Sequence, residues 1–528
     1  MVLILSLIEE MRATNQESVS FDRVKDRFLN YFIDEQEKGN WIDKPSGREL
    51  WRVVPKSQLK DIINSPVNAL SQVFIYVHSE DNTIGFHNQI QRQLGDEELT
   101  ELEKLAHKGL YLYNTVGYDE DVETLPQEAE PMKDEQVIGN LHQIQSHIRR
   151  KGFFFPEHLI ENFYLSLKTK PFVILAGISG TGKTRLVKLF AEALGATGNN
   201  GQFTLIPVRP DWSDPADLLG YKDLSGRFKP GPLTEVLVEA RKPENQYKPY
   251  FICMDEMNLA RVEHYFSDLL SVLETQDWQE GKIQTQDLIS SIMLDTPEDQ
   301  GKFGSLGIPE NVFLIGTVNM DETTHPFSKK VLDRANTLEF NYINLQQYPD
   351  FNVQVETSDS SDVAELNHLF LRSDYLQLVD AYDTNKELVV RTTERLVKIN
   401  ALLEDIHAHV GFRVRDAICF YMIYNERYKL MSEEEAFDWQ LLQKILPRIQ
   451  GSHSSVRRVL LNLMSGALGT GSGVTVDFPA FMDDASPLYL KWAAGQTPPT
   501  AKHPQSARKL AFMLRRLEED GFTSYWLS

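Results

Sequence analysis

Cysteine is scarce in this chain of 528 residues, which has only Cys253 and Cys419. Two thiols cannot build a disulfide framework or a cysteine-rich zinc module, and they are typical of a reducing compartment. Basic residues are also in deficit, because 54 lysines and arginines face 76 aspartates and glutamates and give a formal net charge of −22. This charge argues against a protein that coats nucleic acid by bulk attraction. Any contact with DNA would therefore require a local basic strip or a channel formed by assembly of several chains.

The sequence also lacks an apolar run long enough to cross a membrane. The apolar start, residues 1–8, ends at Glu9 and Glu10, far short of the roughly 20 residues that a span needs. Neither a basic leader nor a small-residue cleavage site flanks it, unlike in a signal peptide. With 41% apolar and 25% charged residues, the composition is that of a folded globular protein. We therefore expect a cytoplasmic protein of about three domains with no membrane partner.

Changes of pattern along the chain predict four regions. Short helical and strand patterns mix over residues 1–113, which indicates a small α+β domain with a possible recognition or docking role. Residues 114–136 include eight acidic residues and two prolines and are expected to form a solvated linker. Strand-like and helical runs alternate over 137–363, and the pattern over 364–528 is almost wholly helical.

Continuous apolar runs mark the strands of the third region. They lie at residues 172–176, 203–208, 250–254 and 312–317. Since these runs do not alternate with polar residues, both faces of each strand are expected to be buried. The sequence therefore predicts an α/β fold in which helices cover a parallel sheet.

A glycine-rich loop follows the first of these strands directly. Residues 177–184 read Gly-Ile-Ser-Gly-Thr-Gly-Lys-Thr, which is the phosphate-binding loop pattern. Glycines let backbone amides turn toward phosphate oxygens, and the next helix adds its positive N-terminal end. Lys183 is expected to reach the β and γ phosphates, and the Thr184 hydroxyl to ligate Mg²⁺. The predicted nucleotide-binding residues are Gly177, Ser179, Gly180, Thr181, Gly182, Lys183 and Thr184.

Polar residues follow two of the other strands. Asp255 and Glu256 end the apolar run 250–254, a placement that suits a Mg²⁺ ligand followed by a base for an attacking water. Asn319 comes just after the run 312–317 and can orient that water. Arg334 follows a helical pattern further on. Each of these residues is ambiguous by itself, and it is their combination with the phosphate loop that favours catalysis.

These features, in this order, resemble those of AAA+ ATPases, and most closely the McrB-type family of modified-DNA restriction motors. The resemblance covers about 138–528, whereas the first 113 residues carry no recognised similarity. The segments that carry it are 208–214, 217–221, 254–263, 316–334 and 411–416, and 444–452 and 506–522 are also similar.

The resemblance implies an AAA+ core with a helical lid and a homo-oligomeric ring, usually a hexamer. Arg334 would then act on the γ-phosphate bound by a neighbouring subunit. Arg413 is the candidate sensor-2 residue, with Arg415 as its alternative. Family members that use GTP carry Met-Asn followed, after two further residues, by an aspartate. Here only one residue separates Asn319 from Asp321, so the aspartate comes one residue early. ATP is therefore ranked above GTP, and both stay open, with Mg²⁺ as the expected cofactor.

The resemblance also implies a function. McrB-type rings drive a separate McrC-type nuclease subunit and recognise modified DNA through an N-terminal domain. We therefore expect an NTP-hydrolysing motor of a McrBC-like restriction or antiphage complex, with DNA reached through residues 1–113 or through the ring. A MoxR-like protein-remodelling ATPase has the same core residues and stays open. So does a nucleotide-gated scaffold with little turnover, although Glu256 argues against it.

Overall fold

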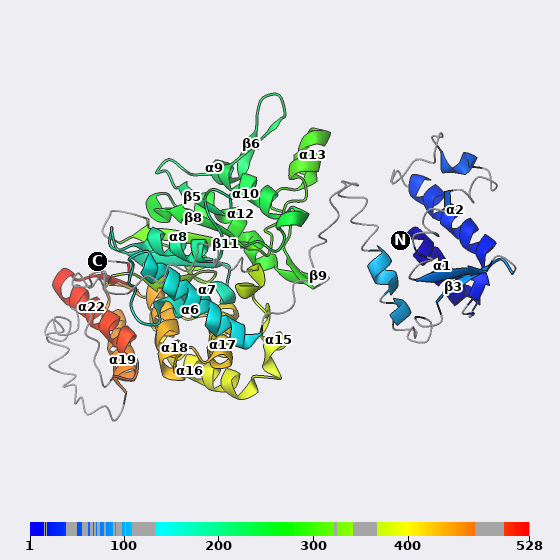
Figure 1. Cartoon of the computed structure of the whole chain (residues 1–528). Helices are drawn as coiled ribbons and strands as arrows, with labels where there is room; N and C mark the ends of the chain where they lie inside the picture. Colours follow the sequence, from blue (N-terminus) through cyan, green and yellow to red (C-terminus); the bar gives the residue numbers. More distant parts are fainter. Residues whose placement is uncertain are drawn as a thin grey trace. The chain divides into compact units, whose positions relative to one another are not determined.

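The computed structural model divides the chain into two compact units, Met1–Gln127 and Glu128–Ser528 (Figure 1). In the described part of the chain, no helix is long and apolar enough to cross a membrane. The predicted linker 114–136 lies outside the described residues as far as 132, and its residues 134–136 begin a helix. The structure describes residues 1–14, 16, 18–37, 50–54, 62–63, 67, 70, 74–78, 81–87, 90, 98–100, 102–107, 133–279, 281–320, 325–341, 367–469 and 501–526.

The first unit is a small α+β body. Its sheet has the antiparallel order β1-β3-β2, built from β1 (Ser18–Ser20), β2 (Ile75–His78) and β3 (Thr83–Phe86). The helices α1 (Val2–Thr14) and α2 (Phe21–Glu37) contact each other and β1. In α2 the apolar side chains recur every three or four residues, which buries one face of the helix. Those buried residues are Phe21, Val24, Phe28 and Phe32.

The second unit is built on a five-stranded parallel sheet. Its strands are β4 (Phe172–Gly177), β5 (Phe203–Pro207), β8 (Tyr250–Asp255), β11 (Val312–Asn319) and β12 (Asn336–Glu339), in the order β12-β4-β11-β8-β5. Parallel register holds across all four neighbouring pairs. The sheet confirms the predicted α/β fold class, with strands at all four predicted runs.

The edge strand β12 was not predicted. Its sequence, Asn336-Thr337-Leu338-Glu339, has one apolar residue in four, yet all four residues are buried. Asn336 donates from Nδ2 to the Ser166 carbonyl at 3.0 Å, and Glu339 pairs with Lys509 at 2.8 Å. A strand that buries polar side chains, two of them against distant partners, leaves no apolar run in the sequence.

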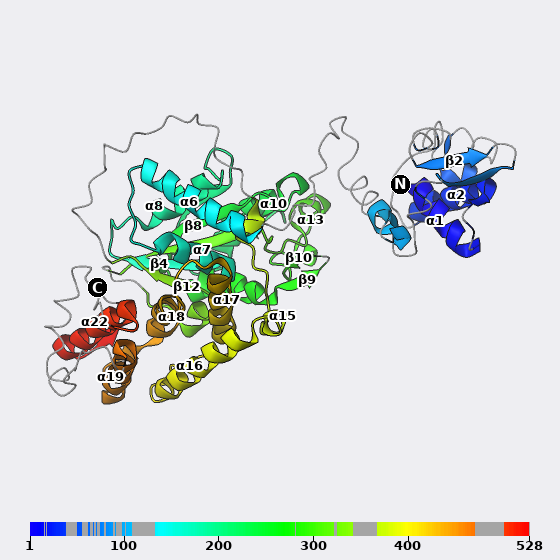
Figure 2. The ribbon, with the colours of Figure 1, turned by 60° about the horizontal axis from the view of Figure 1, so that its bottom comes forward.

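Helices cover the sheet on both faces and continue into a helical region. Residues from α7, α8 and α10 contact its strands. The helical region lies beside the sheet in both ribbon views (Figures 1 and 2). The helices are α6 (Asp134–Arg150), α7 (Leu159–Thr169), α8 (Lys183–Ala193), α9 (Ala216–Leu219), α10 (Pro232–Ala240), α11 (Val262–Tyr265), α12 (Ser267–Val272), α13 (Pro297–Phe303), α14 (Lys329–Leu332), α15 (Leu378–Tyr382), α16 (Lys386–Glu404), α17 (Phe412–Tyr428), α18 (Glu433–Gln440), α19 (Ser454–Leu468) and α22 (Pro504–Asp520).

Short two-stranded pairs complete the second unit. The hairpins β6 (Gly220–Lys222) with β7 (Phe228–Pro230), and β9 (Asp277–Gln279) with β10 (Lys282–Gln284), project from the α/β part. A third pair joins β13 (Gln450–Gly451) to β14 (Thr523–Ser524). Because β14 follows α22 directly, this pair ties the end of α22 to the chain between α18 and α19.

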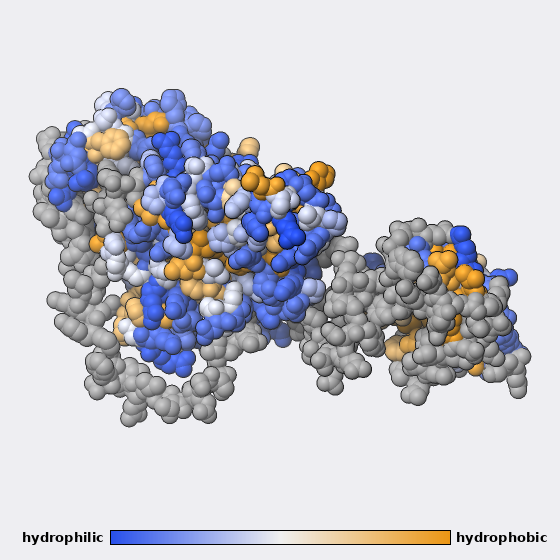
Figure 3. All heavy atoms as spheres, turned by 90° about the horizontal axis from the view of Figure 1, so that it is seen from above, coloured by the Kyte–Doolittle hydropathy of each residue, from blue (hydrophilic) through white to orange (hydrophobic). Residues whose placement is uncertain are grey.

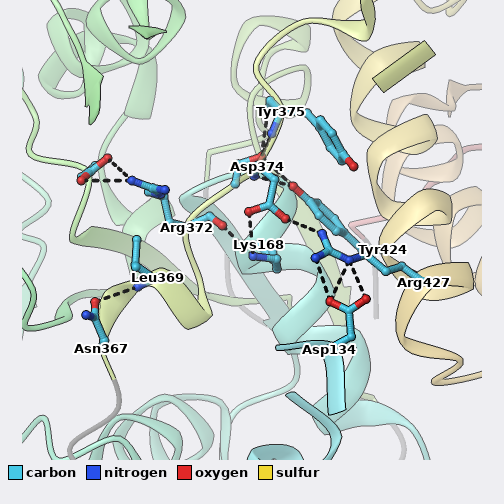
Figure 4. A network of polar contacts seen from close by, with 11 residues as sticks. Asp134, Lys168, Asn367, Leu369, Arg372, Asp374, Tyr375, Tyr424 and Arg427 are labelled. Carbon is cyan, nitrogen blue, oxygen red and sulfur yellow. Dashed lines mark hydrogen bonds and ion pairs between the residues drawn. The ribbon is translucent and has the colours of Figure 1, made fainter. Parts of the chain in front are cut away.

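A network of polar contacts fixes the helical region against the helices that precede the sheet (Figure 4). Arg427 of α17 donates from Nε to both carboxylate oxygens of Asp134, at 2.9 and 3.0 Å, and pairs with Asp374 at 3.0 Å. Lys168 of α7 lies 3.5 Å from Asp374 and donates to the Arg372 carbonyl at 2.8 Å. Burial lowers the pKa of Lys168 to about 8, although the Asp374 carboxylate opposes this shift. The network therefore joins α6, α7 and α17.

One face of the second unit is mainly polar. In the face shown in Figure 3, hydrophilic residues cover most of the described surface, and apolar residues form small separated areas. This agrees with the composition of a folded globular protein that exposes most of its charge.

Candidate functional site

The glycine-rich loop 177–184 connects β4 to α8. Gly180 and Gly182 have φ of +79° and +89°, in the left-handed region where glycine is favoured. Gly182 caps the N-terminus of α8, which begins at Lys183. The sequence thus turns the chain sharply between a buried strand and a helix start. This is the local geometry that exposes backbone amides to an anion.

Lys183 folds back over this loop. Its Nζ donates to the carbonyls of Gly177 at 2.9 Å and Ile178 at 2.8 Å, and the residue is buried. Thr181 donates from its hydroxyl to the same Ile178 carbonyl at 3.0 Å, whereas Ser179 is exposed. A positive charge therefore lies within the loop, where phosphate oxygens would be attracted to it.

The first of the predicted acidic residues contacts the loop helix directly. Asp255, at the end of β8, accepts through Oδ1 from the Thr184 hydroxyl at 2.9 Å. The same oxygen accepts from the Thr317 hydroxyl of β11 at 2.7 Å. Because β8 and β11 are neighbouring parallel strands, their carboxyl ends meet at the edge of the sheet that also carries the loop. The predicted pair Thr184 and Asp255 is thus in contact.

Glu256 and Asn319 form a second contact at the same edge. Asn319 donates from Nδ2 to the Glu256 carboxylate at 2.8 Å. The Glu256 backbone amide donates to the Thr317 hydroxyl at 3.1 Å. Glu256 itself has φ of +53°, a left-handed conformation that costs a non-glycine residue about 1 kcal/mol or more. This strained residue is the one whose carboxylate contacts Asn319.

The oxygen donors at this edge fit Mg²⁺. A hydroxyl and a carboxylate, from Thr184 and Asp255, lie side by side, and Mg²⁺ is usually held by one or two such ligands together with phosphate oxygens and water. In the described residues there is no group of three or more His, Cys, Asp or Glu side chains that could hold a metal by itself. The residues therefore suit a metal that arrives with a nucleotide.

Arg334 lies at the opposite edge of the sheet. It precedes β12, in which Asn336 is in register with Val173 of β4. At about 3.3 Å per residue, Gly177 is about 13 Å further along the sheet, beyond the reach of the Arg334 side chain. Arg334 pairs through Nε with Glu274 at 3.2 Å and donates to the Leu270 carbonyl at 2.8 Å. It cannot reach the loop of its own chain.

Arg413 shares the partner of Arg334. At the start of α17, it pairs with the other carboxylate oxygen of Glu274. Arg415 instead pairs with Asp416 at 2.7 Å and lies over the Phe412 ring. The structure therefore places Arg413 beside Arg334, at the edge away from the loop that it was predicted to approach. One helical turn from Gly411 does not bring either arginine to the phosphates.

Half-buried Lys170 also lies at this second edge. It directly precedes Pro171 and β4, and its pKa is lowered by burial, while the Glu274 and Asp416 carboxylates oppose that shift. Both carboxylates thus lie near the amino end of β4. The arginine cluster of Glu274, Arg334 and Arg413 belongs to that end.

Sequence reasoning missed three residues of these two edges. Thr317 and Glu274 carry no motif, although a polar residue inside the otherwise apolar run 312–317 was a usable signal. Asn341, just beyond β12, accepts through Oδ1 from the Ile178 amide of the loop at 3.1 Å. No signal in the sequence pointed to Asn341, because β12 itself was not predicted.

Comparisons with known proteins agree with this geometry. A curated relative, the type IV methyl-directed restriction enzyme EcoKMcrB subunit of Escherichia coli K12, is 26% identical over 196 residues. The match covers 37% of this chain and 39% of that protein, so the chain spans well under half of the length of its relative. Residues 356–522 match a family described as a domain of unknown function, DUF8727.

Two solved structures show distant similarity. A protein from Cytophaga hutchinsonii, described as a candidate ATPase, has 15% identity and a TM-score of 0.34, covering 66% of this chain and 90% of its own. NtrX from Brucella abortus has 12% identity and a TM-score of 0.22, covering 47% of this chain and 45% of its own. Residues 172–335, which include the loop, both acidic residues and Arg334, match a family described as an AAA domain of the dynein-related subfamily.

Proposed function

We propose that this chain binds and hydrolyses ATP or GTP with Mg²⁺. The observation that carries the proposal is the convergence of Thr184, Asp255, Glu256 and Asn319 at the edge of the sheet that holds the phosphate loop. An AAA domain implies nucleotide binding, typically with Mg²⁺. The oxygens of Thr184 and Asp255 would hold the metal, which supplies positive charge against the phosphates when bound.

The remaining residues have distinct roles in this proposal. The backbone amides of 177–184 and the Lys183 ammonium bind the phosphates. Glu256 accepts the proton of the water whose oxygen attacks the γ-phosphorus, while the bond to the β-phosphate oxygen breaks. Asn319 holds the Glu256 carboxylate through the contact at 2.8 Å and helps to orient that water. Proton acceptance at a fixed carboxylate is worth about 10²–10⁴ in rate.

Arg334 is proposed to act on a neighbouring subunit. Register with β4 puts it at the far edge from its own loop, and its contacts with Glu274 and the Leu270 carbonyl hold it there. A second chain that presents its loop to this edge would complete the site. AAA ATPases commonly oligomerise, and a head-to-tail contact of this kind closes into a ring. A hexamer is the proposed size.

Steady-state phosphate release from the purified chain tests hydrolysis. ATP and GTP are compared, each with Mg²⁺, and Glu256→Gln is the blank because it keeps an oxygen that can accept from Asn319. Release by the native chain that is lost in the blank supports the proposal, and the faster base identifies the substrate. Tight nucleotide binding without release from the native chain would replace hydrolysis by a nucleotide-gated scaffold.

We further propose that hydrolysis drives a McrBC-like restriction or antiphage complex. The support is the similarity to the EcoKMcrB subunit over 196 residues. The proposed partners are a McrC-type nuclease subunit and duplex DNA, contacted through residues 1–113 or through the ring. Turnover should rise on addition of methylated duplex DNA. A turnover that ignores DNA, yet rises with an unfolded protein substrate, would favour a MoxR-like remodelling ATPase.

A further inference from the structure

A series of hydrogen bonds, here called the relay, connects the phosphate loop to the end of β12 and then to α22. The Ile178 amide, at the second position of the loop, donates to Asn341 Oδ1 at 3.1 Å. Asn341 Nδ2 donates in turn to Glu339 Oε1 at 2.5 Å. Gly177 packs so closely on this side that a Cβ there would lie 2.5 Å from the Phe340 carbonyl oxygen. The start of the loop is thus fixed by the end of β12.

The relay continues into the helical region. Lys509, on α22, donates from Nζ to the same Glu339 Oε1 at 2.8 Å, and both side chains are almost fully buried, at 2% and 3% exposed. The ammonium also lies 4.4 Å from the centre of the Tyr525 ring. Burial lowers the pKa of Lys509, and the Glu339 carboxylate opposes this shift by favouring the charged form.

The segment of α22 that carries Lys509 is itself firmly anchored. Asp438 of α18 accepts from the backbone amides of Gln505 at 2.7 Å and Ser506 at 2.8 Å, which caps the first turn of α22. Asp438 is buried, so this cap is shielded from water. The first turn of α22 is therefore fixed to α18.

We propose that Lys509, Glu339 and Asn341 are positioning residues that couple the docking of α22 to the conformation of the phosphate loop. The inference rests on the proposed nucleotide binding at that loop. When α22 is docked, Asn341 is held against Glu339, and its oxygen fixes the Ile178 amide. The loop then meets the phosphates already ordered. When α22 leaves, Asn341 is released and the loop must be ordered by the nucleotide itself.

Thermodynamic linkage makes this coupling reciprocal. If docked α22 favours nucleotide binding, bound nucleotide must favour docked α22 by the same factor. A loop that has lost one ordering hydrogen bond of this kind is expected to bind nucleotide about three- to tenfold more weakly. Nucleotide should in turn slow hydrogen exchange of the α22 amides. A residue with a merely structural role would show neither effect.

Two variants and a matched control test the relay. Asn341→Ala removes the link to Ile178, and Lys509→Met removes the link to α22. Lys444→Met is the control, because buried Lys444 also reaches β12 from the helical region, donating to the Ala335 carbonyl at 2.6 Å at the other end of the strand. The double variant Lys509→Met with Glu339→Gln avoids a buried unpaired carboxylate if Lys509→Met alone does not fold.

Affinity for Mg·ADP and Mg·GDP is measured by calorimetry, and exchange of the α22 amides by mass spectrometry with and without nucleotide. Asn341→Ala and Lys509→Met should each weaken binding about three- to tenfold and abolish the protection of α22 by nucleotide. Lys444→Met should change neither. Native affinity in both relay variants would overturn the inference while leaving the proposed function intact. Failure of the native chain to bind either nucleotide would instead overturn the proposed function.

Discussion

The two edges of the parallel sheet carry opposite chemistry. At the carboxyl edge, Asp255 accepts from the hydroxyl of Thr184 in the phosphate loop, and Glu256 accepts from the amide of Asn319. At the amino edge, Arg334 and Arg413 share one carboxylate. The first edge is suited to receive a nucleotide, whereas the second presents fixed cations about 13 Å or more away. Within one chain, therefore, the arginines of the amino edge cannot reach the loop at the carboxyl edge.

The largest effect is expected from mixing variants of the two edges. Arg334→Ala should lower turnover about 10³–10⁵-fold, because an arginine acting in trans offsets charge that develops in phosphoryl transfer. Glu256→Gln should also be inactive by itself. An equal mixture should regain activity, since about a quarter of head-to-tail interfaces then join an intact Glu256 to an intact Arg334. Phosphate release from the mixture measures this, and no recovery would count against the trans assignment.

Removal of the Lys183 ammonium at the carboxyl edge should weaken nucleotide binding. Lys183→Ala is expected to weaken nucleotide affinity about 10- to 100-fold, because it removes charge-assisted hydrogen bonds to phosphate. Lys188→Ala is the matched control, since Lys188 lies on the same helix with an exposed side chain paired to Glu192 at 3.9 Å. Calorimetry with Mg·ADP separates the two variants. Equal affinities would remove the assignment of the loop.

The amino edge can be loosened without touching its arginines. Glu274→Gln keeps the shape of the side chain but removes the charge that holds Arg334 and Arg413. Turnover should fall only a few-fold, because a partly exposed ion pair contributes little free energy to holding Arg334 in place. Nucleotide affinity should stay unchanged. Glu310→Gln is the control, because Glu310 pairs with Arg372 at 3.2 Å at the start of β11. If both variants lowered turnover equally, Glu274 would have no special role in positioning Arg334.

The smallest effects concern pH at the start of α22. Burial lowers the pKa of His503 to about 4, so the unfolded chain binds the extra proton and stability falls as pH drops from 6.5 toward 4. Burial raises the pKa of Asp438 to about 6, so the folded chain holds the extra proton and stability grows as pH drops from 6 toward 3.8. Each contributes at most about 3 kcal/mol, and the two slopes nearly cancel between pH 4 and 6.

Single variants separate the two opposed dependences of stability on pH. His503→Asn should leave a chain that becomes more stable from pH 6 to 4, and Asp438→Asn one that becomes less stable over the same range. Denaturant melts at pH 4, 5, 6 and 7 measure the free energy of unfolding. Parallel profiles for both variants and the native chain would contradict the opposed titrations.

The sequence predicted the carboxyl edge better than the amino edge. The loop 177–184, Asp255, Glu256 and Asn319 each follow a buried apolar strand, and parallel strands bring such residues together by their topology alone. The AAA domain and the fold class are confirmed, while the catalytic roles and the domain boundaries stay predictions. The preference between ATP and GTP stays open as well, because Asp321 lies outside the described residues.

The amino edge depends on contacts between distant segments, which a single sequence does not record. Arg413 is separated from Glu274 by more than a hundred residues, and nothing in the helical spacing after Gly411 revealed that partner. In the same way, β12 is stabilised by Ser166 and Lys509, from opposite ends of the unit. A strand of polar residues that is buried against such partners has no apolar run, so its sequence predicts a loop.

Chemical modification of the two buried lysines at the ends of β12 would report any separation of the helical region from this strand. Lys444 and Lys509 are both buried, so an amine-reactive reagent can reach either only when the helical region separates from the strand. Acylation of Lys444 then reports openings at the amino end of β12, and acylation of Lys509 reports openings at the end beside the phosphate loop. The ratio of the two modification rates, read from a single digested sample, tells which end of the strand the helical region leaves first.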